Sequence, residues 1–232
     1  MTEGDLPLCP PQKWHHTNYC AVAQADGGLE ITMYKLQMKL QRIISYLCLA
    51  ATALTFIYSL GLSTDVYFLY RLESLDGIVI PGAEMFYELQ PFNKQFTTYS
   101  IVLLLLAVAG LIFNNHTRRK YYVANYLTVG ASSVANIALG TWALTNVLHY
   151  KDLFNAIDFS VIASIVDSVP PAVLISKGVD PENLAGPYST LWFDLVIPVF
   201  IILTLVTLLN VANAVFKTIL MSKEKQLLKE GA

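Results

Sequence analysis

The feature that most constrains this chain is a set of four long apolar runs. Residues 43–62, 97–113, 121–148 and 191–216 contain a single charged side chain among them, that of Asp194. A helix rises about 1.5 Å per residue, so about 20 apolar residues cross the roughly 30 Å of hydrocarbon in a bilayer. The sequence therefore predicts an all-α fold, an integral membrane bundle with one transmembrane helix over each of these ranges.

The composition agrees with a membrane protein and argues against an ordinary soluble enzyme. Hydrophobic residues make up 55% of the chain and charged residues 14%, whereas soluble domains carry about 25% charge. The sequence has no Gly-rich phosphate loop, His-Glu-x-x-His, Gly-x-Ser-x-Gly or Cys-x-x-Cys motif. We therefore predict a protein that is not an enzyme and has no cofactor, metal or nucleic-acid partner.

The first 32 residues differ from the rest of the chain. They are polar and non-periodic, and they lack the apolar centre and cleavage site of a signal peptide. We predict a disordered or loosely attached leader over residues 1–32, followed by a four-helix domain over residues 33–232. The alternative is that the leader is not translated and that the natural chain starts at Met33 or Met38. Four residues of the leader carry possible zinc ligands at a spacing that matches no common zinc site: Cys9, His15, His16 and Cys20.

Two long segments between the predicted spans are rich in acidic residues. Within the first, residues 66–96, a Pro81-Gly82 pair predicts a turn after a short strand. Within the second, residues 149–190, apolar residues recur every fourth position from Leu153 to Ile165, which predicts a short amphipathic helix. Pro170 and Pro171 should end that helix.

The distribution of basic residues predicts the orientation in the membrane. Of the 15 Lys and Arg residues, the two long segments hold four, and the other 11 lie before the first span, in the short hairpin after residue 113 and near the C-terminus. The hairpin contains Arg118, Arg119 and Lys120, which we interpret as a topology anchor. Because basic residues are retained in the cytoplasm, both termini and the hairpin should be cytoplasmic.

Residues 121–148 form the span richest in small side chains. Ala131 and Ala135 lie four residues apart, as do Ser132, Asn136 and Gly140. Small residues allow helices to approach closely, and Ser or Asn can form hydrogen bonds between helices. This pattern favours a packing helix at the centre of the bundle. The alternative is that Asn136 lines a polar path.

Three polar residues of the last span are further candidates for a site. Asp194 is the one acid within a span, and such residues are often functional because a charge is costly to bury in lipid. The competing interpretation is structural, because Asp194 falls in the first helical turn, behind Ser189 and Thr190 as N-cap residues. Asn210 and Asn213 share a helix face near the inner end. Pro198 should kink this helix.

Parts of the sequence resemble a known group of proteins. Residues 115–126 (NHTRRKYYVANY), the Val211-Ala212-Asn213 triplet and the Lys-rich end are similar to uncharacterised small four-helix membrane proteins of Gram-positive bacteria. The resemblance covers residues 38–230 and leaves out the leader. It implies a bacterial plasma membrane as the location and implies nothing about chemistry.

These observations lead to two hypotheses about function. The first is a non-enzymatic accessory or scaffold subunit of a membrane complex, with the lipid bilayer and another membrane protein as partners. The second is a small transporter or channel component that uses the candidate polar residues within the helices: Asn136, Asp194, Asn210 and Asn213.

Overall fold

The computed structural model describes residues 17–65, 81–82, 84–116, 123–176 and 189–230, and these residues are largely helical and contain no strand. Four long helices form the body of the molecule: α1 (Thr17–Asp65), α3 (Met85–His116), α4 (Val123–Asn155) and α9 (Val196–Glu230). Three short helices complete the described chain: α5 (Phe159–Ser168), α6 (Pro171–Ser176) and α8 (Leu191–Asp194).

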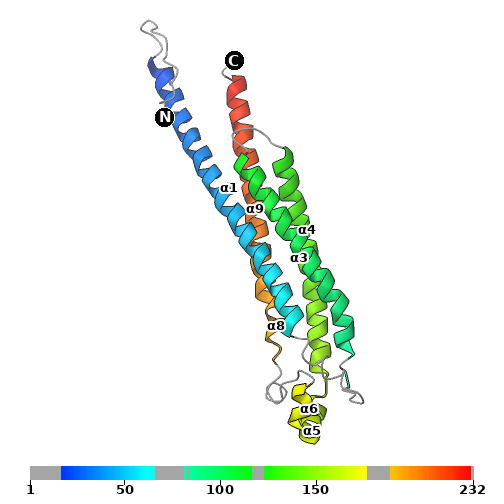
Figure 1. The fold of residues 1–232 in the computed structure, drawn as a ribbon. Coiled ribbons are helices and arrows are strands. Elements are labelled where there is room, and N and C mark those ends of the chain that lie inside the picture. Colours follow the sequence, from blue (N-terminus) through cyan, green and yellow to red (C-terminus); the bar gives the residue numbers. More distant parts are fainter. Residues whose placement is uncertain (1–16, 66–80, 83, 117–122, 177–188, 231–232) are drawn as a thin grey trace.

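The four long helices form an antiparallel bundle in which each helix packs against the next in the sequence and α9 returns against α1 (Figure 1). The start of α1 and the end of α9 lie at the same end, which we call the terminal end. Helices α5 and α6 lie at the opposite end, which we call the loop end. The predicted all-α four-helix bundle is therefore confirmed.

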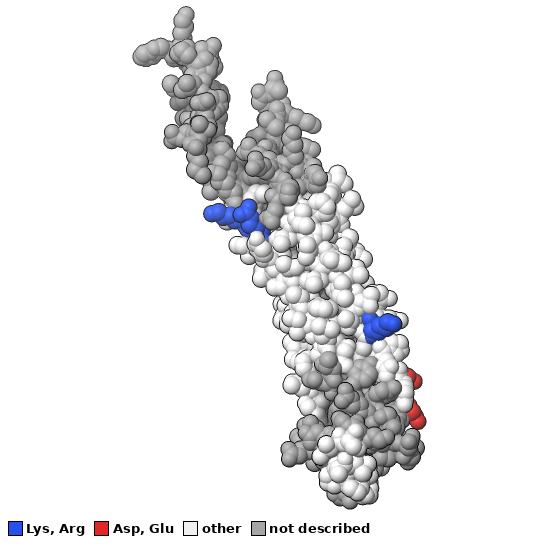
Figure 2. All heavy atoms as spheres, viewed as in Figure 1, with Lys and Arg blue, Asp and Glu red and all other residues white. Residues whose placement is uncertain are grey.

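Four segments are long and apolar enough to cross a membrane, one each in α1, α3 and α4 and one that runs from α8 into α9. These segments are Leu36–Ser63, Met85–Asn114, Val123–Asn155 and Leu191–Lys223. The outer surface is apolar as well, with Leu105, Val134 and Ile57 all more than 60% exposed. Figure 2 shows that the middle of the visible face carries no Lys, Arg, Asp or Glu. Such a surface is stable when lipid rather than water surrounds it.

Helix α3 begins earlier than the predicted span over residues 97–113. The Pro81-Gly82 turn is confirmed, and Gly82 has a φ of 89°, which favours glycine. Helix α3 then starts at Met85, so residues 85–96 belong to a helix and not to an outer loop. Apolar side chains at three- and four-residue spacing hold these turns against the bundle, although Pro91 lies within them. The buried residues are Phe86, Leu89, Phe92 and Phe96. The predicted strand before the turn lies outside the described residues.

The predicted amphipathic helix over residues 153–165 is wrong in its limits. Leu153 belongs to the last turn of α4, the chain turns at residues 156–158, and α5 starts only at Phe159. The four-residue spacing of apolar residues continues across this turn because Ile157, which is 4% exposed, packs into the bundle core. The predicted stop is confirmed, since α5 ends at Ser168 before Pro170.

The last span is broken near its start rather than kinked within the helix. Helix α8 ends at Asp194, Leu195 forms a turn, and α9 starts at Val196. Pro198 has no N–H to donate to the carbonyl of Asp194, and its ring is crowded by that carbonyl. The break therefore falls one turn before the proline.

Part of the predicted leader lies in helix α1. Helix α1 starts at Thr17, so residues 17–32 continue the first membrane span as a helix. Extending an existing helix costs much less free energy than starting a new one. Residues 1–16 lie outside the described residues, and a start at Met33 or Met38 stays a prediction.

The loop-end half of the bundle has a core of aromatic side chains. The ring centroids of Phe92 and Trp142 are 4.9 Å apart, and those of Phe154 and Phe193 are 5.4 Å apart. Tyr58 belongs to the same core, and its hydroxyl donates to the carbonyl of Trp192 at 2.9 Å. Aromatic rings thus join α1, α3, α4 and α8 in the part of the bundle that is nearest the short helices.

We expect Gly140→Ala in α4 to destabilise the protein. A Cβ at Gly140 would collide with the ring of Phe200 in α9, and overpacking of this kind costs about 1–3 kcal/mol. The matched control is Gly130→Ala on the same helix, where a Cβ meets no atom within 4 Å. Thermal unfolding in detergent should show a lower midpoint for Gly140→Ala alone. Equal midpoints for the two variants would contradict the close contact between α4 and α9.

Candidate functional site

Helix α1 carries a line of polar side chains along the face that points into the bundle. These residues recur at intervals of three, four or seven, which places them on one side of a helix. All are less than 5% exposed: Gln37, Gln41, Ser45, Thr52, Thr55 and Ser59. Polar groups of this kind are costly in a membrane interior unless the protein supplies hydrogen-bond partners. The terminal-end half of the bundle supplies many of them.

Amide side chains connect three helices near the terminal end. Gln41 Nε2 donates to the Oδ1 of Asn114 on α3 at 3.2 Å, and Asn114 Nδ2 donates to Ser45 Oγ at 2.5 Å. Gln37 Nε2 donates to Gln41 Oε1 at 3.1 Å and to the Oδ1 of Asn213 on α9 at 3.4 Å. All five side chains are buried. The network therefore fixes the register of α1 relative to both neighbouring helices.

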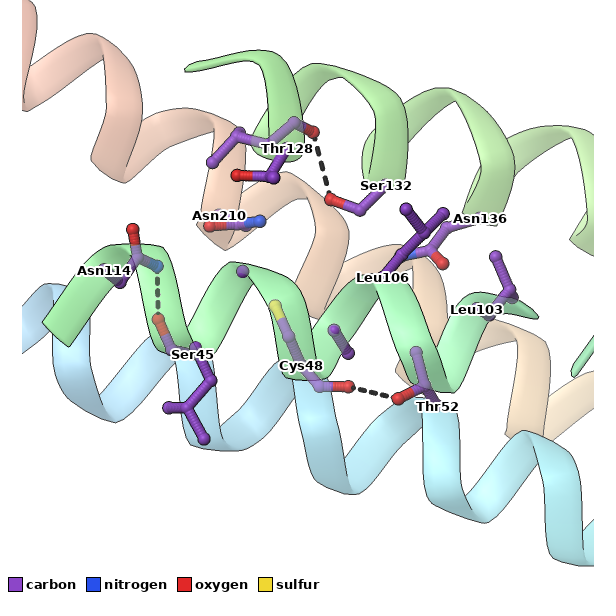
Figure 3. Close-up of a pocket in the computed structure, with 14 residues that line it drawn as sticks. Ser45, Cys48, Thr52, Leu103, Leu106, Asn114, Thr128, Ser132, Asn136 and Asn210 are labelled. Atoms are coloured by element: carbon purple, nitrogen blue, oxygen red, sulfur yellow. Dashed lines mark hydrogen bonds between the residues drawn. The ribbon is translucent and has the colours of Figure 1, made fainter. Parts of the chain in front are cut away.

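A small polar cavity lies next to this network, between the four long helices (Figure 3). Its volume accessible to a water-sized sphere is about 20 Å³. Every long helix contributes polar or small side chains to the lining. The polar lining residues are Ser45, Cys48 and Thr52 from α1, Asn114 from α3, Thr128, Ser132 and Asn136 from α4, and Asn210 from α9.

Asn136 lies deep in the bundle and links α4 to α9. Its Nδ2 donates to Thr207 Oγ1 at 2.9 Å, and the Thr207 hydroxyl donates to the carbonyl of Leu203 at 2.7 Å. The Asn136 side chain is 7% exposed, and its Oδ1 has no hydrogen-bond partner among the described residues. The cavity therefore has an unsatisfied acceptor on one of its lining residues.

The four predicted polar residues do not converge on one site. Asn136 and Asn210 line the cavity, and Asn213 belongs to the adjacent amide network. Asp194 lies in α8, close to the end of α4, where its Oδ1 is 2.6 Å from Lys151 Nζ. This ion pair is partly exposed, which agrees with a structural role for Asp194 at the start of the last span.

The two predicted N-cap residues, Ser189 and Thr190, use their side chains differently. The N–H of Leu191 donates to Ser189 Oγ at 3.1 Å. Thr190 makes no side-chain cap bond and instead donates its hydroxyl to Asp194 Oδ2 at 2.9 Å. The predicted topology anchor, Arg118 with Arg119 and Lys120, lies outside the described residues.

Sequence analysis missed most of the amide network. Gln37 and Gln41 stand beside basic residues and look like part of a solvated approach to the first span, while Asn114 looks like part of the hairpin. The available signal was the helical spacing of polar residues from Gln37 through Ser59, which continues into an apolar run. Lys217, counted with the basic residues near the C-terminus, is also buried at 2% exposure, and its Nζ has no hydrogen-bond partner among the described residues.

The bond between Asn136 and Thr207 provides a test of the interior packing. We expect a double-mutant cycle with Asn136→Leu and Thr207→Val to give a coupling free energy of about 0.6 kcal/mol, which is the average for hydrogen bonds between membrane helices, and at most about 1.7 kcal/mol. The measurement is reversible unfolding in mixed micelles. The control cycle combines Asn136→Leu with Ser100→Ala. Its coupling free energy should be near zero, because the Ser100 hydroxyl donates to the carbonyl of Phe96 in its own helix. Additive effects in the first cycle would show that the bond is absent.

Among the residues that the structure describes, no group of three or more His, Cys, Asp or Glu side chains is placed to hold a metal ion. Comparison of the chain with protein-family models, with curated proteins and with solved structures finds no match. The fold and the interior of the bundle are therefore the basis for functional inference.

Proposed function

We propose that this protein is a non-enzymatic accessory or scaffold subunit that packs against a transmembrane helix of another membrane protein. The observation that carries this proposal is an open groove between α3 and α4 on the outer surface of the bundle, with a volume of about 380 Å³. Its lining is mainly apolar or small: Gln95, Tyr99, Val102, Leu103, Ala135, Ala138, Leu139 and Trp142.

Small side chains make this groove suitable for a helix. Ala135 and Ala138 on α4 leave the backbone within reach of a neighbouring helix, which is the usual basis of helix association in membranes. Tyr99 and Trp142 are in ring contact at 5.6 Å and also line the groove. Gln95 adds one polar side chain, which can form a hydrogen bond to a partner in the absence of competing water.

The small residues of α4 divide between the inside and the outside of the bundle. Asn136 and Gly140 are buried against α9. In contrast, Gly130, Ala131 and Ala138 are exposed, and a Cβ at Gly130 meets no atom within 4 Å. The exposed part of this pattern supports a further helix–helix contact beyond those within the bundle.

The second candidate function is a small transporter or channel component. The polar cavity beside Asn136 and Asn210 favours it. The position of Asp194 does not, because Asp194 is paired with Lys151 near the loop end. The aromatic core around Phe92 and Phe96 fills the bundle on that side of the cavity. We therefore rank the accessory subunit first.

For the location we propose a bacterial plasma membrane with both ends of the chain in the cytoplasm. The distribution of Lys and Arg along the sequence supports the orientation, and the resemblance of residues 115–126 to small membrane proteins of Gram-positive bacteria supports the type of membrane. The bundle agrees with this arrangement in one respect, since an even number of long helices puts the start of α1 and the end of α9 on the same side.

The partner helix can be sought with a photo-reactive amino acid placed at Ala138. We expect irradiation of native membranes to link this position to one membrane protein, because a helix in the groove lies against the Ala138 side chain. The readout is the mass shift on a gel, followed by mass spectrometry of the product. A matched probe at Ala50, an exposed alanine on α1, should give lipid products only.

The same groove can be blocked without changing the interior. Ala138→Trp should abolish co-purification of the partner found by cross-linking, whereas Ala50→Trp should leave it intact. Undiminished co-purification with Ala138→Trp, or cross-links from Ala138 to lipid alone, would remove the proposal.

The orientation can be tested by reversing the charge of the hairpin. Replacing Arg118, Arg119 and Lys120 with Glu should leave part of the protein inserted in the wrong orientation, because the basic residues hold the hairpin on the cytoplasmic side. A reporter enzyme that is active on only one side of the membrane is fused to the C-terminus, and its activity is measured. Normal insertion together with loss of the partner would show that the hairpin binds the partner instead.

A further inference from the structure

We propose that the polar cavity between the four long helices is a hydrated binding site, in which a water molecule donates a hydrogen bond to Asn136 Oδ1. The site takes small hydrogen-bond donors of the size of water and lies inside the membrane-spanning part of the bundle. This cavity is separate from the groove that we propose for the partner helix, which lies on the outer surface between α3 and α4.

The size of the cavity fits such an occupant. About 10–15 Å³ of volume accessible to a water-sized sphere is enough for one water molecule, and this cavity offers about 20 Å³. Apolar cavities of this size stay empty, but a polar lining with several partners retains water. Eight of the lining residues have polar or thiol side chains, as given above for Figure 3.

Several lining side chains keep acceptor capacity that no hydrogen bond within the described residues uses. The hydroxyls of Thr52, Thr128 and Ser132 donate to carbonyls of their own helices at 2.9–3.1 Å. Their oxygen lone pairs remain able to accept a hydrogen bond. Asn136 Nδ2 is used by Thr207, so Asn136 offers the cavity its unsatisfied Oδ1.

A water molecule can satisfy this arrangement. It donates two hydrogen bonds and accepts others, so it can serve Asn136 Oδ1 and one hydroxyl oxygen together. The lining contains no Asp or Glu, so no charge is present to hold a divalent cation. The chemistry of the cavity therefore selects a small neutral donor.

Cys48 lines the cavity and provides a built-in probe. X-ray radiolysis of the full-length protein in lipid nanodiscs and H₂¹⁸O generates hydroxyl radicals from nearby water, and mass spectrometry reads the ¹⁸O added to sulfur. We expect Cys48 to gain ¹⁸O several-fold faster than a cysteine introduced by Leu105→Cys, since Leu105 is 64% exposed on the outer surface of α3. Equal rates at the two positions would overturn the proposal.

A matched pair of glycine variants tests whether the water lies in this cavity. Gly110 lines the cavity and Gly130 lies on the outer surface of α4, and a Cβ at either position meets no atom within 4 Å. Gly110→Leu should therefore occupy the cavity and abolish the labelling of Cys48, and Gly130→Leu should leave it unchanged. Persistent labelling in folded Gly110→Leu protein would overturn the proposal, and the wild-type comparison decides the matter if this variant does not fold.

Discussion

The structure depends on one constraint, which is that polar groups inside a membrane-spanning bundle must find partners within the protein. Helix α1 brings Gln37, Gln41 and Ser45 into the interior, where lipid supplies no hydrogen bonds. Each donates a hydrogen bond to an amide or carbonyl oxygen of α1, α3 or α9, and Gln37 Oε1 is left without a partner among the described residues. A buried polar atom left without a partner costs about 1–3 kcal/mol, so these contacts fix how the helices can be placed against one another.

The same constraint explains why the two halves of the bundle differ. Toward the loop end, aromatic side chains such as Phe92, Phe96 and Trp142 fill the interior and need few hydrogen bonds. Toward the terminal end, amides and hydroxyls replace them, and their directional geometry leaves a cavity where the four helices meet. The interior is therefore polar, with a small cavity, on one side and packed with aromatic rings on the other.

Some of the fold could be predicted because membrane insertion imposes simple rules on sequence. The four spans follow from length and lack of charge, and the Pro81-Gly82 turn follows from its residue types. The early start of α3 could not be predicted in this way, because Glu88 and Lys94 suggest a loop when only charge is considered. Both are exposed on a helix whose other face is buried, and that face is visible only once α3 packs beside its neighbours.

The sequence by itself determined that the chain is a bundle of four membrane helices, since four apolar runs are long enough to span as helices and a helix satisfies its own backbone hydrogen bonds in lipid. It also identified Asn136, Asn210 and Asn213 as polar residues within spans. The tertiary structure alone decided which of them meet. It separated Asp194 from the other three, joined Gln41 to Asn114, and turned one row of small residues on α4 outward. The physical reason is that the pairing of helix faces depends on contacts between residues far apart in the chain, which no local pattern records.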